Sequence, residues 1–372
     1  MRKFFEVKTR DKSSQARVGE IKTSRWMIET PCFIPDATYG AVKHLTAEDL
    51  GQVGLQMILG NIYHLRIRPG TREIQKLGGL HQLMNWDGPI LTDSGGWQVF
   101  SLIYQYGMGK VKKDGIEYKD HLTGQKHWLT PEKCLEDQLN IGSDILMILD
   151  YPVAAKAEEN ENRYSVSTTV RWAKKAKIFY DQHPKMKEKM MMAIIQGANS
   201  KELRKECFAE LESLWPWPGY GFGGPTVNDE IIEYTASLIP ESRLRYLMGA
   251  GPPEQIVRAV AQGWDLFDCV IPTRNARHGM AYTFSGPVKI YQKQYELDDS
   301  PIEKDCPCLA CQGYTRAYIR HLLKIDEPAG KRLMTIHNLT FYMRLMKKIR
   351  QDIKSGQFQP GRLLDQLENS GN

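Results

Sequence analysis

The sequence lacks any run of about 20 consecutive apolar residues, the length that a helix needs to cross a bilayer. It also lacks the compositional extremes of disordered, collagen-like and small disulfide-rich chains, because 41% of its 372 residues are hydrophobic and 25% are charged. The segment from Met1 to Lys8 turns charged too early for a secretory signal peptide. We therefore expect a folded cytoplasmic protein with no membrane partner.

Net charge is also small, at +6, and by itself it indicates no polyanionic partner. Its placement is uneven, since residues 301–372 hold 12 Lys and Arg but only 7 Asp and Glu. This basic segment is compatible with a surface for a phosphate backbone, although a solvated helix face is the simpler interpretation.

Cysteine is scarce, and seven residues cannot make a complete disulfide framework. Three of them crowd together at Cys306, Cys308 and Cys311, and reduced thiols at this spacing predict a metal site. With His337 they would form a closed tetrahedral zinc site, which leaves no position for a catalytic water and is therefore structural. His321 is the alternative fourth ligand.

Eight short apolar runs alternate with longer mixed segments. The residues that end them are Asp36, Asn61, Asp93, Asp150, Gln196, Gly223, Gly249 and Asp268. Runs of this kind suit strands buried on both faces of a parallel sheet, and helical patterns at 131–140 and 252–260 lie between them. The alternation predicts an α/β fold of the (β/α)8 TIM barrel type, with an open doubly wound sheet as the alternative.

The carboxyl ends of barrel strands meet at one mouth. Asn61, Asp93, Asp150, Gln196 and Asp268 would converge there as three carboxylates and two amides. Such a set predicts a hydrogen-bonding pocket with more than one candidate acid or base.

Two motifs at this mouth carry chemistry. In residues 93–98, Asp-Ser-Gly-Gly-Trp-Gln, the glycines allow a close backbone approach and Trp97 is able to stack on a flat base. The alternative is a turn in which Asp93 caps a helix. Asp268 is a candidate nucleophile at an anomeric carbon, and Arg274 and Arg277 suit phosphate or base contacts; a structural Asp–Arg pair is the alternative. Cys269 is interpreted as packing.

These motifs together resemble the tRNA-guanine transglycosylase family from Thr30 to beyond His337. The resemblance is carried by residues 61–65 (Asn-Ile-Tyr-His-Leu), 93–98, 267–274 (Phe-Asp-Cys-Val-Ile-Pro-Thr-Arg), the cysteine cluster and 314–322. It implies a TIM barrel with a zinc-binding subdomain inserted near the C-terminus, which we expect at about 290–345 within a single barrel domain over 1–372. It also implies exchange of the wobble guanine of tRNA for a 7-deazaguanine base in queuosine formation.

The resemblance assigns roles to residues. Asp268 would be the nucleophile at the ribose C1′ and Asp93 the general acid/base, with a covalent tRNA–enzyme intermediate. The residues that would bind the base are Asp150, Gln196, Gly223, Gly224, Trp97 and Met248, with Asn61 supporting the nucleophile region. Arg274 and Arg277 would hold the uridines that flank the target.

The implied partners are the tRNA anticodon loop, a 7-deazaguanine base and a second copy of the chain, contacting through the zinc region. One structural Zn2+ is the implied cofactor. The alternatives are a non-catalytic, zinc-containing tRNA-binding subunit and a carbohydrate hydrolase. The presence of both Asp93 and Asp268 favours the catalytic interpretation.

Three departures from the bacterial pattern concern the pocket. Trp97 stands where Phe or Tyr is usual, Tyr151-Pro152 replaces an acid and a cysteine, and residues 225–229 read Pro-Thr-Val-Asn-Asp in place of Leu-Ala-Val-Gly-Glu. The last two segments would line the side that meets the 7-substituent. Both 7-aminomethyl-7-deazaguanine and queuine therefore remain candidate bases.

Overall fold

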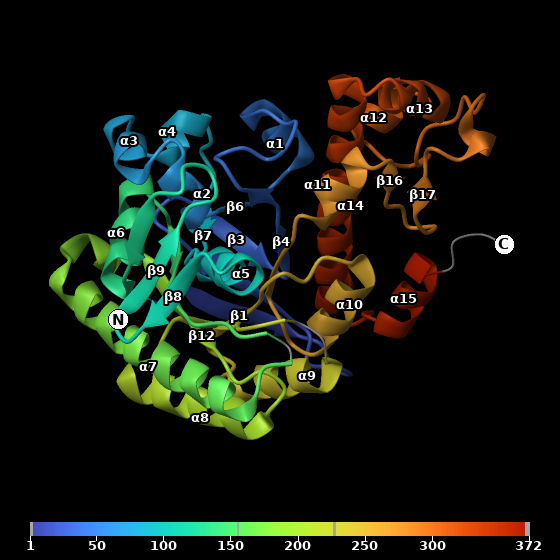
Figure 1. Cartoon of the computed structure of the whole chain (residues 1–372). Helices are drawn as coiled ribbons and strands as arrows, with labels where there is room; N and C mark the ends of the chain where they lie inside the picture. Colours follow the sequence, from blue (N-terminus) through green and yellow to red (C-terminus); the bar gives the residue numbers. More distant parts are fainter. Residues whose placement is uncertain (1–2, 155, 226–227, 369–372) are drawn as a thin grey trace.

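A closed parallel barrel forms the centre of the computed structural model, which describes residues 3–154, 156–225 and 228–368 (Figure 1). Within these residues, one sheet has the strands β4 (Cys32–Ile34), β5 (Asp36–Ala37), β6 (Ile58–Gly60), β7 (Ile90–Thr92), β11 (Ile145–Met147), β12 (Met190–Ile195), β13 (Gly219–Phe222), β14 (Leu244–Leu247) and β15 (Leu266–Asp268). Pro35 splits the first strand, whose two parts pair with β15 and with β6 and so join the ends of the sheet. The predicted barrel is confirmed, and the open sheet is wrong.

Helices connect the strands of this barrel. They are α1 (Ala47–Val53), α2 (Ile62–Ile67), α3 (Thr71–Lys76), α4 (Leu80–Met84), α5 (Gly96–Tyr106), α6 (Pro131–Ile141), α7 (Glu159–Gln182), α8 (Lys201–Leu214), α9 (Asp229–Leu238) and α10 (Pro253–Ala261), with the short 3-10 helix η1 (Pro184–Glu188) after α7. Both helices expected from the sequence are present. The start of α6 shows why, since the Thr130 hydroxyl caps the Lys133 N–H and Pro131 occupies the first turn.

The strands are buried on both faces, as their continuous apolar runs predict. Along β12, Met190, Met192 and Ile194 belong to the core inside the barrel, whereas Met191 and Ala193 belong to the core beneath the helices. This alternation follows from the period of two in a strand. It explains why no polar residue interrupts the run.

An antiparallel sheet closes the barrel at the end opposite the mouth. Its strands are β1 (Phe5–Arg10), β2 (Arg17–Lys22) and β3 (Met27–Thr30). Phe4, Phe5, Ile21 and Ile28 pack into the same core as the residues inside the barrel. The amino-terminal end is thereby sealed with apolar side chains, which leaves the carboxyl ends of the strands as the open face.

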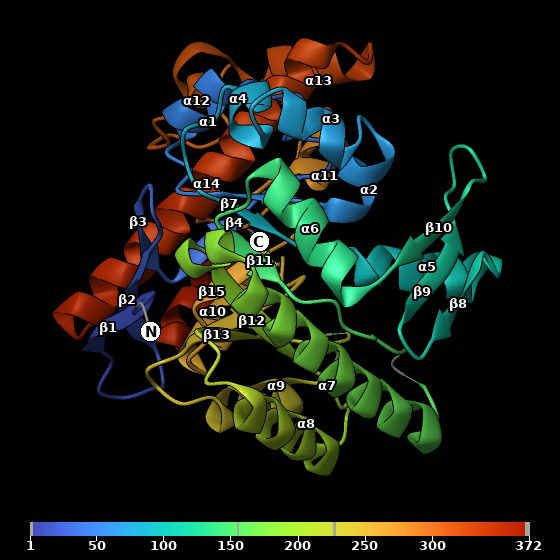
Figure 2. The ribbon, with the colours of Figure 1, turned by 90° about the vertical axis from the view of Figure 1, so that its left-hand side faces the viewer.

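Two further segments extend from the barrel. A three-stranded sheet of β8 (Gly109–Lys112), β9 (Gly115–Lys119) and β10 (Lys126–Leu129) projects to one side (Figure 2). The other segment leaves after β15 and consists of α11 (Ile271–Arg277), β16 (Met280–Ala281), β17 (Val288–Lys289), η2 (Lys293–Tyr295), α12 (Leu309–Gly313) and α13 (Arg316–Lys324).

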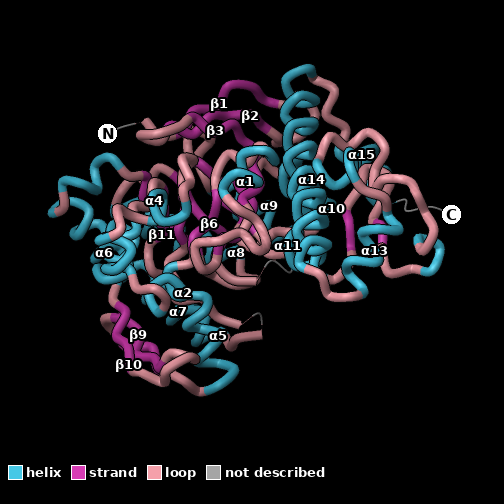
Figure 3. Tube along the Cα trace, turned by 90° about the horizontal axis from the view of Figure 1, so that it is seen from above, coloured by secondary structure: helices cyan, strands magenta, loops and turns pink. Residues whose placement is uncertain are grey.

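The long helix α14 (Pro328–Ser355) joins this second segment to the barrel. It packs against α11, α12 and α13 and also against β1, β2 and β4. Figures 1 and 3 show it standing between the barrel and α13, and α15 (Pro360–Glu368) then packs against α10. Among the described residues, no helix has the length and apolar character required to cross a membrane.

A buried ion pair ties the N-terminal sheet to the barrel. The Arg17 guanidinium donates to both Asp265 oxygens, at 2.9 and 2.7 Å, and to the backbone carbonyls of Glu241 and Arg243. Arg17 is 3% exposed and Asp265 is fully buried. Since Asp265 directly precedes β15, this pair holds β2 against the last two strands.

We predict that Arg17→Met lowers the free energy of unfolding by about 3–5 kcal/mol, because it leaves the Asp265 charge buried without its partner. Urea unfolding followed by circular dichroism measures the change. The double variant Arg17→Met/Asp265→Asn should recover part of the loss. Full stability in Arg17→Met, or no recovery in the double variant, would contradict this explanation.

Candidate functional site

A cavity of about 480 Å³ opens at the carboxyl ends of the barrel strands. Asn61, Asp93, Asp150 and Asp268, four of the five residues predicted for the mouth, line it. The fifth, Gln196, does not line the cavity but donates to Asp150 from the next strand. The predicted convergence of carboxylates and amides is therefore present.

Asp93 follows β7 and is held by donors from the start of α2. Asn61 Nδ2 donates to one carboxylate oxygen at 2.6 Å, and the Ile62 N–H donates to the other at 2.8 Å. The Asn61 carbonyl oxygen caps α2 by accepting from the His64 N–H. Asn61 thus contacts Asp93, not Asp268. Burial raises the pKa of Asp93 to about 7, although the backbone donors act in the opposite direction.

Asp150 follows β11 and lies between two side-chain donors. Ser94 Oγ donates to it at 3.1 Å and Gln196 Nε2 at 2.7 Å. Burial raises the pKa of Asp150 to about 6, while these two donors lower it. Gln196 Oε1 is buried and has no partner among the described residues. The described part of the protein therefore leaves this acceptor unused.

Glycines bring the backbone close to this polar edge. A Cβ on Gly223 would lie 2.5 Å from Gln196 Nε2, so a larger residue would displace the amide. Gly224 has a φ of +90°, which favours glycine, and lines the cavity. Trp97 and Met248 line the same cavity, and Trp97 is 46% exposed. The cavity lining therefore combines an aromatic ring, a thioether and a glycine backbone.

Asp268 ends β15 beside donors from β14 and the loop after it. The Tyr246 hydroxyl at 2.6 Å and the Gly249 N–H at 2.9 Å both donate to the same oxygen, Oδ1. Burial raises the pKa of Asp268, and both donors favour the ionised form. Neighbouring Cys269 stays a thiol at neutral pH because burial raises its pKa to about 11.

The two arginines lie on α11, directly after Asp268. Arg274 is exposed and lines a second, more open cavity of about 670 Å³, which shares Asp36 and Asp268 with the first. Arg277 is partly buried, donates to the Thr273 carbonyl and lines neither cavity. The structure therefore brings Arg274 to the mouth and places Arg277 one turn further along α11.

Sequence reasoning missed several residues of the site. Asp36, Ser94, Gln98 and Tyr246 all line the first cavity. The signal for Asp36 was the same as for Asp93, since each directly follows an apolar run. Tyr246 lies two residues after Leu244 on β14, and strand alternation places both inside the barrel.

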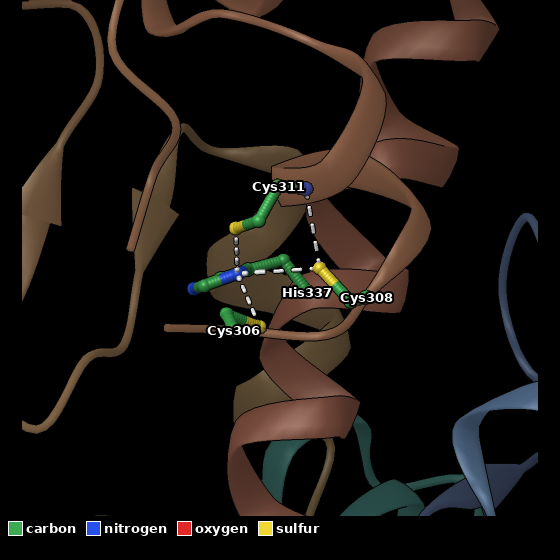
Figure 4. Close-up of side chains that lie close together, drawn as sticks. All are labelled: Cys306, Cys308, Cys311 and His337. Carbon is green, nitrogen blue, oxygen red and sulfur yellow. Dashed lines mark hydrogen bonds between the residues drawn. The ribbon is translucent and has the colours of Figure 1, made fainter. Parts of the chain in front are cut away.

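The predicted metal ligands lie together between α12 and α14 (Figure 4). The ligating atoms of Cys306, Cys308, Cys311 and His337 all lie within 4.8 Å of one another, and each residue is buried. His337 Nε2 lies 2.9 Å from the Tyr282 carbonyl, which places its proton there and leaves Nδ1, 3.3 Å from the Cys311 sulfur, free for a metal. Exposed His321 on α13 lies outside this group, so the alternative ligand is wrong. This donor set fits a metal ion.

Comparison with known proteins decides the family. A family model described as queuine tRNA-ribosyltransferase matches residues 11–362. The chain belongs to this family. It is 45% identical over 362 residues to a queuine tRNA-ribosyltransferase from Dictyoglomus turgidum, covering 96% of this chain and 92% of the relative.

Two further relatives carry the same name. The protein from Pelotomaculum thermopropionicum is 43% identical over 358 residues, with 95% of each chain covered. The protein from Caldanaerobacter subterraneus subsp. tengcongensis is 42% identical over 356 residues, which are 94% of this chain and 93% of the relative. Each match covers more than nine-tenths of both chains, and the resemblance found in the motifs is confirmed.

The crowded carboxylates predict a pH-dependent effect on stability. A raised folded-state pKa means that the stabilisation is present at low pH and is lost as the pH rises through that pKa. Asp268→Asn keeps the acceptor for Tyr246 and Gly249 and removes the charge. We expect it to raise the melting temperature by about 2–6 °C at pH 8 and by less at pH 5.

Thermal unfolding of the wild type and the variant at both pH values measures this difference. Asp87→Asn, at an exposed carboxylate before β7, is the matched control and should leave the melting temperature unchanged at both pH values. An equal shift at both pH values would show that charge burial is not the cause.

The four clustered ligands predict a bound metal ion whose loss lowers the melting temperature. Purified protein should carry about one metal ion per chain, and Cys308→Ser should lose it and melt at a lower temperature. Mass spectrometry of the bound metal measures the content. Cys269→Ser, outside the cluster, should retain the ion. Full metal content in Cys308→Ser would rule out the thiolate as a ligand.

Proposed function

We propose that this chain is a tRNA-guanine transglycosylase, which exchanges the wobble guanine of tRNA for a 7-deazaguanine base in queuosine formation. One observation carries the proposal: a chain that matches the family model over residues 11–362 has Asp93 and Asp268, each held by specific donors, at one cavity in the mouth of the barrel. No observation favours the non-catalytic tRNA-binding subunit or the carbohydrate hydrolase.

Asp268 is the proposed nucleophile. Its carboxylate attacks the ribose C1′ as the bond from C1′ to the guanine nitrogen breaks, and the electron pair leaves with guanine. A covalent bond then joins Asp268 to the ribose. The Tyr246 and Gly249 donors hold Oδ1 and favour the ionised form, which suits a nucleophile.

Asp93 is the proposed general acid and base. It gives its proton to the departing guanine and later takes one from the incoming base, which attacks C1′ and releases Asp268. A pKa of about 7 suits both steps, because the group must exchange a proton near neutral pH. Two displacements at one carbon retain its configuration. Asn61 orients Asp93 through its 2.6 Å hydrogen bond.

Residues in and beside the cavity are proposed to recognise the base. Asp150 would accept hydrogen bonds from the N–H groups of the base. Gln196 and the Gly223-Gly224 backbone would contact its remaining polar atoms, and Trp97 and Met248 would cover the two faces of its ring. The support is the unpartnered Gln196 Oε1 and the close Gly223 backbone.

The side of the cavity that would meet the 7-substituent is proposed to select the incoming base. Pro152 and Pro225 line the cavity there, whereas Tyr151 is 7% exposed and its hydroxyl lies 3.4 Å from that of Tyr104. Asn228 caps α9, and residues 226 and 227 lie outside the described part of the chain. We keep 7-aminomethyl-7-deazaguanine and queuine as candidate bases. Exchange rates with each base in turn decide between them.

On the RNA side, Arg274 and Arg277 are proposed to hold the nucleotides that flank the target. The target base must be unstacked to enter the cavity, which costs less in an anticodon loop than in a duplex. Basic residues of α13 and α14 that are exposed, such as Lys324 and Lys347, are proposed to extend this surface. We place the enzyme in the cytoplasm, where its tRNA substrate is found.

The metal ion is proposed to be zinc, held by Cys306, Cys308, Cys311 and His337. When bound, it would fasten α12 to α14 within a subdomain at about 290–345 of a single 1–372 barrel domain. Exposed apolar side chains on this segment support a homodimer that contacts there. They include Tyr314 and Tyr318, whose rings stack at 5.6 Å, and Ile325, which is 59% exposed.

Removing the nucleophile tests the proposal. Asp268→Asn should lower guanine exchange into an anticodon-loop RNA by at least about 10³-fold and abolish the covalent complex, because no carboxylate attacks C1′. Incorporation of labelled guanine and a denaturing gel of enzyme with RNA measure both. Asp87→Asn should behave as wild type. Guanine exchange that survives in Asp268→Asn would contradict the assignment of Asp268 as the nucleophile. A wild-type protein that binds RNA but exchanges no guanine would instead indicate the non-catalytic subunit.

A further inference from the structure

We propose that Asp36 accepts a hydrogen bond from the 2′-hydroxyl of the target ribose and so makes the enzyme selective for a ribonucleotide at that position. This inference rests on the proposed function. It concerns the one carboxylate of the first cavity that the mechanism above does not use.

The register of the barrel places Asp36 beside the nucleophile. On neighbouring strands, Asp268 pairs with Ile34, and Asp36 lies two residues further along the same split strand. Since side chains two apart share a face, Asp36 points inward like Ile34, which belongs to the core inside the barrel. Asp36 therefore lies one step nearer the mouth than Asp268.

The two cavities meet at this carboxylate. Asp36 and Asp268 are the acidic residues that line both the inner cavity and the outer one, together with Trp97, Gln98 and Gly249. A nucleotide whose base fills the inner cavity and whose phosphates lie in the outer one must place its ribose at this junction. The atom that Asp268 attacks, C1′, is bonded to the carbon that carries the 2′-hydroxyl.

The hydrogen bonding of the four carboxylates sets Asp36 apart. Asp93, Asp150 and Asp268 each accept two hydrogen bonds from protein donors. Within the described residues, no hydrogen bond or ion pair engages the Asp36 carboxylate. This carboxylate is partly buried, and without a protein donor its oxygens are free to accept a hydrogen bond from water or from a ligand.

The electrostatics of this position agree with a ligand donor. Burial is the main reason that the pKa of Asp36 is raised well above its ordinary value, and Asp268 and Asp93 add to the effect. Arg274, the charge that acts in the opposite direction, is exposed on α11. A hydroxyl donor at Asp36 would favour its ionised form in the same way as Tyr246 does for Asp268.

The proposed contact also assists the reaction. Positive charge develops at C1′ when the bond to guanine breaks, and hydrogen bonds to the neighbouring hydroxyl strengthen in such transition states. A donor–acceptor pair that includes a charged group is worth about a 10- to 100-fold difference in rate or binding. Loss of either partner should therefore have a similar effect on kcat/KM.

A double-mutant cycle between protein and RNA tests the inference. The substrates are two anticodon-loop hairpins that carry either guanosine or a single 2′-deoxyguanosine at the target position. The proteins are wild type, Asp36→Val, which removes the acceptor, Asp36→Asn, which keeps one, and Asp87→Val, an exposed control before β7. Labelled guanine exchange gives kcat/KM for each pair, and melting temperatures confirm folding.

For the wild type and for Asp87→Val, we expect kcat/KM on the deoxy hairpin to be about 10- to 100-fold lower than on the ribose hairpin. On the ribose hairpin, kcat/KM of Asp36→Val should be lower than that of the wild type by a similar factor. Going from the ribose to the deoxy hairpin should then lower kcat/KM of Asp36→Val by less than about 3-fold. Asp36→Asn should lie between wild type and Asp36→Val, because its carbonyl still accepts.

Two results would overturn the assignment: an equal deoxy penalty in wild type and Asp36→Val, as expected if Asp36 contacts the base, or no deoxy penalty in the wild type. Failure of the proposed function looks different. The wild type would then exchange no guanine into the ribose hairpin at all, which removes the assignment together with the function.

Discussion

Closure of the parallel sheet is the constraint on which the site depends. The first strand breaks at Pro35, and its two parts pair with different neighbours, so the sheet joins its own ends. Eight strand ends then point to one mouth, because parallel strands share a direction. The apolar plug of the N-terminal sheet seals the other end, and the buried Arg17–Asp265 pair fastens that plug.

This convergence has an electrostatic consequence. Four carboxylates gather at the mouth, and burial raises the pKa of each. Like charges this close disfavour one another's ionised forms, so specific donors are needed to set which group carries a proton. Asn61, Ser94 and Tyr246 supply such donors for three of the four. Burial at this mouth is the main reason that the pKa of Asp93 rises to about 7, and the charge of Asp268 adds to it.

The predicted metal ligands lie on the segment that follows the last barrel strand and on α14. The segment that leaves the barrel after Asp268 carries first the arginines of α11 and then the three cysteines, and α14 returns it to β1, β2 and β4. His337 lies on α14, so its coordination would couple the inserted segment to the barrel. Arg274 and Arg277, which follow Asp268, lie on α11, and this helix packs against α14.

Local patterns in the sequence determined the barrel strands, the carboxylates that end them and the Cys3His group, because short apolar runs and metal-ligand spacings are local signals. They also determined the family. The choice of His337 over His321 depended on which helix reaches the cysteines. The partners of Asn61 and the open acceptor of Asp36 depended on strand register, which pairs residues far apart in the chain. Only the tertiary structure decides such contacts, since packing and register are fixed between elements and not within them.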